Sequence, residues 1–305
     1  MAYLDIGPIV RITPDELHIK DSSYYDQIYA GGCKIRNKDE RFVHIYATPY
    51  SIVGITDHAR HRFRRGVIGE LFSMRSIVNL ESTIDKNVEK LLNRFREARV
   101  SNSVINLSAA FAALTADTIT EHTYGESIGH LDRPDFNIGW KNSVRDTMGS
   151  RVLMKHFPLL LFLLRAMPTG ILSRLNSGIA EISKIEALIK ELSKRSIKRG
   201  KESLKRNKTI LDALTDPSLP PEQRTSEFLT DEGHILLLAG TETTANALTT
   251  ALVYLLENPD IMAKLRGEFE RSFPDNAGLN SWSTLQKLPY LVMSSSHLSA
   301  PSIRN

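Results

Sequence analysis

Residues 239–244 read Ala239-Gly240-Thr241-Glu242-Thr243-Thr244 and lie inside an apolar stretch that covers residues 235–248. The stretch predicts one long helix, with Thr230 as N-cap and an end near Asn258-Pro259. Glycine in a helix costs about 1 kcal/mol relative to alanine, and threonine hydroxyls compete for backbone carbonyls. The pattern therefore indicates a helix that admits a flat ligand, opens a local bulge and offers a hydroxyl and an acid to a reacting centre. A plain helix with Glu242 in solvent is the alternative.

The composition is that of an ordinary globular protein. Hydrophobic residues make up 41% and charged residues 24% of the 305 residues. The net charge of +4 is too small to argue for a nucleic-acid partner. The single cysteine, Cys33, excludes an internal disulfide and favours a reducing, intracellular setting. The first 17 residues do not resemble a signal peptide or an anchor, and the most apolar run, residues 157–164, is shorter than the roughly 20 residues that span a bilayer.

The pattern along the chain predicts a mainly α protein with a small β element at the front. Two short β-type runs, residues 9–12 and 17–19, flank a turn, and the helical pattern begins near Asp57. Apolar stripes at three- and four-residue steps then predict further helices, over residues 77–91, 105–123 and 179–205. The basic stretch beyond Lys194 is either a solvated helix face or a surface for a membrane or an acidic partner.

The motif Ala-Gly-x-Glu-Thr-Thr on a long helix resembles the oxygen-binding helix of the cytochrome P-450 family. Its flanks also resemble fungal members of that family. The similar segments are residues 7–19 (Gly-Pro-Ile-Val-Arg-Ile-Thr-Pro-Asp-Glu-Leu-His-Ile), 57–65 (Asp-His-Ala-Arg-His-Arg-Phe-Arg-Arg), 207–214, 255–259 and 264–269. The resemblance covers residues 5–291 and implies a single cytochrome P-450-like domain, with a β-rich front over about 5–50, a helical part over 57–291 and an atypical tail over 292–305.

By this resemblance, His61 and Arg65 bind the haem propionates, and their i, i+4 spacing places both on one helix face. Ala239 and Gly240 give the haem and the substrate room. Thr243 is the hydroxyl that hydrogen-bonds dioxygen, and Glu242 is its acidic neighbour in proton delivery. Residues 156–158 lie near the substrate entrance. Without the resemblance, a basic surface turn is the favoured interpretation of His61 and its neighbouring arginines.

Two parts of the family pattern are missing. The family continues after residues 288–291 into a helix with Glu-x-x-Arg, whereas this sequence has no glutamate after Glu270. The glycine-rich loop with the cysteine that ligates the haem iron is missing too, and Cys33 lies at the wrong end of the fold to replace it. We therefore expect a chain truncated at both ends and inactive as it stands. A frame error or deletion in the encoding nucleic acid would explain the departure.

The resemblance implies a haem-dependent monooxygenase that oxidises an apolar small molecule, in fungal secondary metabolism. Its partners are dioxygen and an NADPH-dependent reductase, with no nucleic acid. The alternative is a truncated, non-catalytic helical protein that retains only the apolar pocket and binds no haem through a thiolate. Family members are anchored in the endoplasmic-reticulum membrane, but this chain lacks the anchor, which leaves a cytoplasmic or unknown location.

Overall fold

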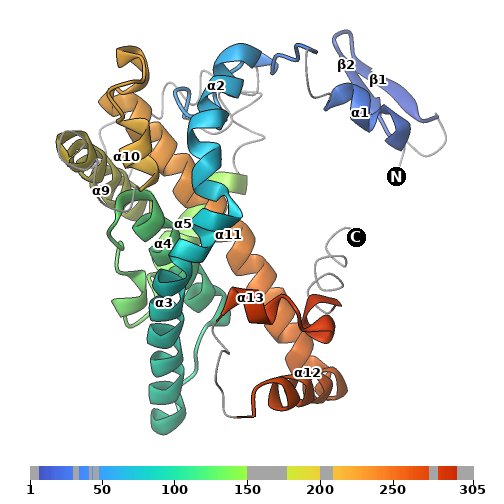
Figure 1. The fold of residues 1–305 in the computed structure, drawn as a ribbon, viewed down its shortest axis with the longest axis vertical. Helices are drawn as coiled ribbons and strands as arrows, with labels where there is room; N and C mark the ends of the chain where they lie inside the picture. Colours follow the sequence, from blue (N-terminus) through green and yellow to red (C-terminus); the bar gives the residue numbers. More distant parts are fainter. Residues whose placement is uncertain are drawn as a thin grey trace.

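The computed structural model describes residues 7–29, 34–40, 43, 48–149, 177–199, 209–274 and 281–293. The described residues form a mainly helical fold with one two-stranded sheet, as the sequence predicts (Figure 1). The strands are β1 (Ile9–Thr13) and β2 (Glu16–Ile19). The α-helices are α1 (Tyr25–Ile28), α2 (His58–Gly69), α3 (Met74–Ser101), α4 (Leu107–Tyr124), α5 (Ile138–Gly149), α9 (Ser177–Arg199), α10 (Ile210–Leu214), α11 (Ser226–Glu257), α12 (Pro259–Ser272) and α13 (Trp282–Leu285). The 3₁₀ turns are η1 (Ser22–Tyr24), η3 (Glu70–Phe72), η4 (His130–Asp132) and η5 (Pro221–Gln223).

The two strands form an antiparallel hairpin, which confirms the β-type runs seen in the sequence. Ile9 pairs with Ile19 and Arg11 with Leu17, and the register is irregular between Arg11 and Thr13 at the turn. Figure 1 shows the hairpin and α1 at the upper right, apart from the main helical body. Within the described part of the first 50 residues, β structure is confined to these two strands.

Helix α11 lies at the centre of the helical packing and carries the Ala-Gly-Thr-Glu-Thr-Thr motif. It runs 32 residues without a break, so the local bulge predicted at the motif does not form. It ends at Asn258, as predicted, because Pro259 opens α12. The predicted N-cap Thr230 is wrong. The helix starts one turn earlier, where the Thr225 hydroxyl accepts a hydrogen bond from the Phe228 amide at 3.2 Å.

The core forms where α11 packs against α4 and α9. Small residues line α4: Ala116 is buried in this core, whereas Ala109, Ala110 and Ala113 are buried in a second cluster with Leu91 of α3. Gly233 of α11 faces Tyr124, whose hydroxyl lies 1.7 Å from the position a Cβ would take. A side chain at 233 would therefore force the helices apart. The buried apolar side chains around this contact are Tyr124, Ile189, Leu192, Ile210, Leu211, Leu214, Leu229 and Leu237.

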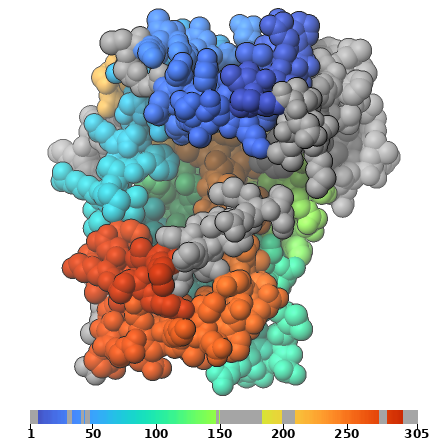
Figure 2. All heavy atoms as spheres, turned by 90° about the vertical axis from the view of Figure 1, so that its right-hand side faces the viewer, coloured from blue at the N-terminus to red at the C-terminus, as the bar shows by residue number. Residues whose placement is uncertain are grey.

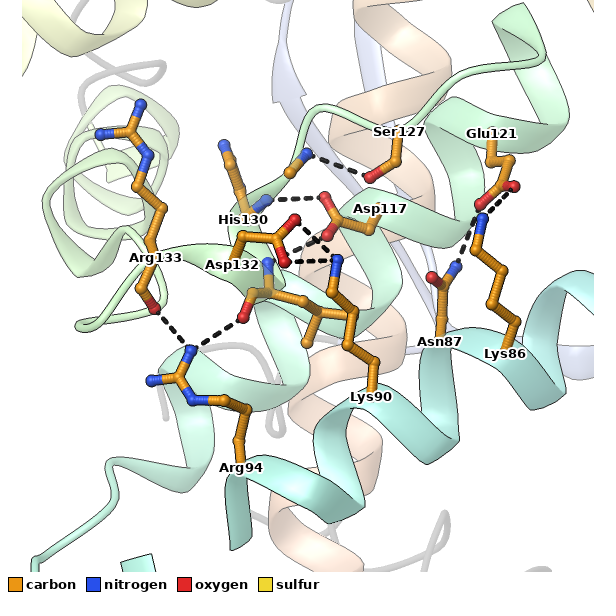
Figure 3. Close-up of polar contacts among 12 residues, drawn as sticks. Lys86, Asn87, Lys90, Arg94, Asp117, Glu121, Ser127, His130, Asp132 and Arg133 are labelled. Carbon is orange, nitrogen blue, oxygen red and sulfur yellow. Dashed lines mark hydrogen bonds and ion pairs between the residues drawn. The ribbon is translucent and has the colours of Figure 1, made fainter. Parts of the chain in front are cut away.

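A polar brace joins α3, α4 and η4 at the edge of this core (Figure 3). The buried Asp117 carboxylate accepts hydrogen bonds from the His130 and Leu131 amides, each at 2.9 Å. Burial raises the pKa of Asp117, and these two amides oppose the rise. From α3, Lys90 pairs with Asp132 at 2.6 Å, and Arg94 donates to the Leu131 carbonyl at 2.9 Å. The brace fixes the chain where it leaves α4.

Helix α12 holds the last described segment of the chain through a buried carboxylate. Both Glu268 oxygens accept backbone hydrogen bonds, from Tyr290 at 2.8 Å and Leu291 at 2.9 Å. These amides belong to the first turn of a helical segment over residues 289–293, so Glu268 caps it from another helix. Among the described helices, no segment combines the length and the apolar character that a membrane span requires.

Candidate functional site

The motif on α11 divides into an outward face and an inward face. Ala239, Thr243 and Thr244 are exposed, whereas Thr241 is buried. The Thr243 hydroxyl donates to the Ala239 carbonyl at 2.8 Å, and Glu242, half-buried, accepts from the Asn246 amide at 3.3 Å. The outward face therefore presents a methyl group, a hydroxyl and a carboxylate within about one helical turn.

The inward face of the motif packs on α4. A Cβ at Gly240 would lie 2.8 Å from Cγ1 of Ile119, so the missing side chain makes room for α4. The Thr115 hydroxyl of α4 donates to the Thr241 carbonyl at 3.2 Å. The structure thus gives Gly240 a packing role, and contact between Gly240 and a cofactor stays a prediction.

Helix α2 carries a cluster of positive charge. The Asp57 carboxylate caps its N-terminus through the Arg60 amide at 2.8 Å. One turn on, half-buried His61 and exposed Arg65 follow at i, i+4, on one face. Burial lowers the pKa of His61, and the neighbouring charges of Lys38, Arg65 and His58 lower it further. Among the described residues, no carboxylate pairs with His61 or Arg65.

The molecule is hollowed on one side of α11. Figure 2 faces the right-hand side of Figure 1 and shows a recess between the blue N-terminal segments above and the orange-red α12 and α13 segments below. Orange-brown atoms of the α11 region lie deeper in this recess. Three apolar side chains farther along α11, Leu248, Val253 and Tyr254, are 36–40% exposed. An exposed apolar helix of this kind is typical of a face that a ligand or further protein covers.

Comparison with known proteins identifies the family to which the chain belongs. The profile of the family "Cytochrome P450" matches residues 19–294. The chain belongs to the cytochrome P450 family. This confirms the fold class and the family predicted from the Ala-Gly-x-Glu-Thr-Thr motif and its flanks.

Fungal members of the P450 family resemble this chain over nearly all of its length. It is 54% identical to the cytochrome P450 monooxygenase claJ of Penicillium crustosum over 94% of this chain and 66% of that protein. It is 39% identical to conidiogenone synthase PchP450 of Penicillium rubens over 93% of this chain and 57% of that protein. A crystal structure of a cytochrome P450, CYP102L1, superposes with a TM-score of 0.67 at 16% identity, over 92% of this chain and 59% of that chain. The chain thus spans between about half and two thirds of the length of these relatives.

The described residues of this P450 chain fit the porphyrin part of haem. Two propionates need hydrogen-bond donors, and α2 presents the Arg65 guanidinium and the His61 ring, neither with a carboxylate partner among the described residues. A flat apolar ring needs small side chains, and the outward face of α11 offers Ala239. The described residues contain no candidate for an axial thiolate, because Cys33 is the one cysteine in the sequence and lies outside them.

The structure brings some of the predicted site residues together and leaves others untested. His61 and Arg65 share one face of α2, and Glu242 and Thr243 lie next to each other on α11. The predicted entrance at residues 156–158 lies outside the described residues. The roles assigned to Thr243, Glu242, His61, Arg65, Ala239 and Gly240 all stay predictions.

Sequence reasoning missed two buried charged residues that link these helices, Arg64 and Glu232. Both side chains are fully buried, and the Arg64 Nε atom lies 3.6 Å from a Glu232 oxygen. A signal was present for Glu232. It follows Phe228 and Leu229 by four and three residues and precedes Ile235 by three, which places a carboxylate on the apolar face of α11.

Proposed function

We propose that this chain forms the front part of a haem-dependent monooxygenase that oxidises an apolar small molecule, in fungal secondary metabolism. Two observations carry the proposal: the outward hydroxyl–carboxylate face of α11, and the face of α2 on which His61 and Arg65 have no carboxylate partner among the described residues. The 54% identity to a fungal P450 monooxygenase supports the same reaction class.

Haem, when bound, supplies the electron transfer and the oxygen chemistry of such an enzyme. His61 and Arg65 would hold the propionates through charge-assisted hydrogen bonds. The Thr243 hydroxyl donates to the Ala239 carbonyl at 2.8 Å, and a rotation about χ1 would free it to donate to a reacting group on the outward face of α11. Glu242 holds the next proton, and the Asn246 amide orients its carboxylate at 3.3 Å. In this way Glu242 and Thr243 would pass protons from solvent to the Thr243 oxygen.

The proposed reaction consumes dioxygen and reducing equivalents, so it needs a reductase that draws on NADPH. The apolar residues exposed along α11 favour an apolar substrate over a charged one. We further propose that residues 1–305 alone do not assemble a haem-thiolate centre. The basis is that Cys33 sits in Gly31-Gly32-Cys33-Lys34, which does not resemble the glycine-rich ligand loop of the family.

The transcript of the gene tests this proposal directly. We expect the messenger RNA to continue in frame past the codon for Leu291, through Glu-x-x-Arg, to a cysteine loop. A transcript that ends after the codon for Asn305 would overturn the monooxygenase proposal for this gene and leave a non-catalytic relative.

A further inference from the structure

Arg64 and Glu232 form a buried ion pair between α2 and α11. Both are 0% exposed, and their closest nitrogen and oxygen atoms are 3.6 Å apart. Burial lowers the pKa of Arg64 to about 10, which leaves it a cation at neutral pH. Burial also raises the pKa of Glu232, and the charge of Arg64 opposes that rise. Helix α2 packs chiefly on α10 rather than on α11, so this pair is a principal link between the two site helices.

Glu232 also holds the segment that leads into α2. The Ile52 amide donates to the Glu232 carboxylate at 2.9 Å, and the Tyr50 amide donates to neighbouring Asp231 at 3.0 Å. Lys38 closes the same segment from its other side, with its ammonium 2.9 Å from the Ile52 carbonyl. Two consecutive carboxylates of α11 therefore fix residues 50–52, only a few residues before the N-cap of α2.

Arg64 is held on its other sides too. Its Nη1 atom donates to the Gln223 carbonyl of η5 at 2.9 Å, and its guanidinium carbon lies 3.4 Å from the centroid of the Phe228 ring. Arg64 is adjacent to Arg65 and three residues after His61, on the same unbroken helix. The place of the Arg64 side chain therefore sets where His61 and Arg65 stand relative to the motif on α11.

Stability alone is a weak reason for this pair. Replacing a buried ion pair with apolar side chains of similar volume is often neutral or stabilising, because desolvation offsets the attraction. Here the desolvation cost is not fully compensated, since one oxygen of Glu232 and the Nε and Nη2 atoms of Arg64 have no hydrogen-bond partner among the described residues. The Arg64–Glu232 pair is therefore better explained by its effect on the position of α2 relative to α11 than by its contribution to stability.

We propose that Arg64 and Glu232 are positioning residues that hold the cationic face of α2, His61 and Arg65, in register with the hydroxyl–carboxylate face of α11. The inference rests on the proposed function, because the register matters only if α2 binds haem propionates. It goes beyond that function in assigning the register to a buried pair that contacts neither haem nor substrate.

Spin-label distances test the placement without haem. Nitroxides at Arg60→Cys and Thr250→Cys, both exposed, in a Cys33→Ser background report the α2–α11 distance in this chain. We expect Glu232→Gln to shift or widen the distribution by more than about 1 Å, a displacement that suffices to disable an oriented site. Glu268→Gln is the matched control, because it alters another buried carboxylate with two backbone donors, on α12. An unchanged distribution in Glu232→Gln would overturn the proposal.

Porphyrin titrations test whether the position of α2 serves propionate binding. Tryptophan quenching gives the affinities of the chain for ferric haem and for its dimethyl ester, which lacks propionate charge. We expect the wild type to prefer the free acid by at least about tenfold, as charge-assisted hydrogen bonds allow. Glu232→Gln should lower that preference to near unity and leave ester affinity within about twofold, since the α11 face is intact. Equal losses for both porphyrins would indicate a merely structural role and overturn the proposal.

Two further variants separate the possible failures. His61→Gln/Arg65→Gln should abolish the preference for ferric haem over its dimethyl ester and leave the spin-label distance unchanged. If the wild type itself shows no such preference, the proposed propionate site is wrong, and the positioning role is not what has failed. Arg64→Met/Glu232→Leu replaces the pair with apolar side chains and should keep the melting temperature near that of the wild type. Its distance and preference should stay altered. Their return to wild-type values would show that packing alone places α2, against the proposal.

Discussion

Thr243 is the residue on which proton delivery depends in this account. Its hydroxyl lies on the outward face of α11 and donates to the Ala239 carbonyl, so its proton is exchangeable and its oxygen can turn outward. Thr244 is equally exposed and is its natural comparison. Of the two hydroxyls, the family motif assigns the catalytic role to Thr243, and the prediction below separates them.

In the complete enzyme, we expect Thr243→Ala to lower the ratio of product formed to NADPH consumed by about 10²-fold, the low end of general acid–base contributions. Thr243→Ser should retain most of the coupling because it keeps the hydroxyl. Product and NADPH measured together give this ratio. The control Thr244→Ala should behave as the wild type, and a coupled Thr243→Ala enzyme would remove Thr243 from proton delivery.

His122 links acidity to the stability of the fold. Burial lowers its pKa below the ordinary value of about 6.5, and the Leu71 carbonyl offsets this only in part. The unfolded chain therefore takes up a proton at higher pH than the folded chain. The stability that neutral His122 contributes is present above pH 6.5 and is lost as the pH falls through the folded pKa.

We expect the free energy of unfolding to fall between pH 7.5 and 5.5, with a contribution from His122 of at most about 1.4 kcal/mol per pH unit. His122→Gln cannot titrate and should flatten that part of the slope. Urea unfolding at several pH values measures both slopes. Identical slopes in the variant and the wild type would show that His122 titrates alike in the folded and unfolded chains.

At the scale of elements, the contact between α4 and α11 depends on the absence of a side chain at Gly233. A Cβ there would meet the Tyr124 hydroxyl oxygen at 1.7 Å and its ring carbon at 2.8 Å. We expect Gly233→Ala to destabilise the chain by about 1–3 kcal/mol, the range for overpacking in a core. Adding Tyr124→Phe should recover part of the loss, since it removes the nearest atom. Urea unfolding of the two single variants and the double variant gives the coupling energy, and an additive result would contradict the contact.

The sequence predicts those elements well whose signals are local. The β1–β2 hairpin, the stripe of α3 and the end of α11 before Pro259 all follow from spacing, turn residues or proline. The start of α11 was wrong because Asp231 and Glu232 resemble first-turn acids after a threonine cap. In the structure they serve tertiary contacts, with Tyr50 and Ile52. Those partners lie far away in the sequence, and no local pattern indicates them.

The same reason limits what the sequence says about the candidate site. The spacing of His61 and Arg65 places them on one helix face, and the motif names Glu242 and Thr243. The packing of Gly240 against Ile119 of α4 is a further feature that the sequence did not indicate, and its place beside haem stays a prediction. The Arg64–Glu232 pair could not be predicted, because which of several neighbouring arginines turns inward depends on how α2 meets η5 and α11.

At the scale of the whole molecule, the chain resembles one part of a larger P450. It spans 66% of claJ and 59% of the CYP102L1 chain, and its recessed side exposes α11. We propose that these residues provide the propionate and proton-delivery faces of the enzyme. The thiolate ligand is supplied by a part of the P450 sequence that the relatives have and this chain does not match. We therefore expect monooxygenase activity and the thiolate-shifted Soret band only when this chain is joined to the remaining P450 sequence.

The most direct test is the ferrous–carbon monoxide spectrum of haem-reconstituted protein, recorded for this chain alone and for this chain joined to the part of claJ that follows the matched segment. Thiolate ligation shifts the Soret band of that complex to the red, and histidine ligation does not. We predict no shifted band for the chain alone and a shifted band for the completed chain, which Arg65→Gln should weaken. A shifted band from the chain alone, or none from a folded completed chain, would contradict the account.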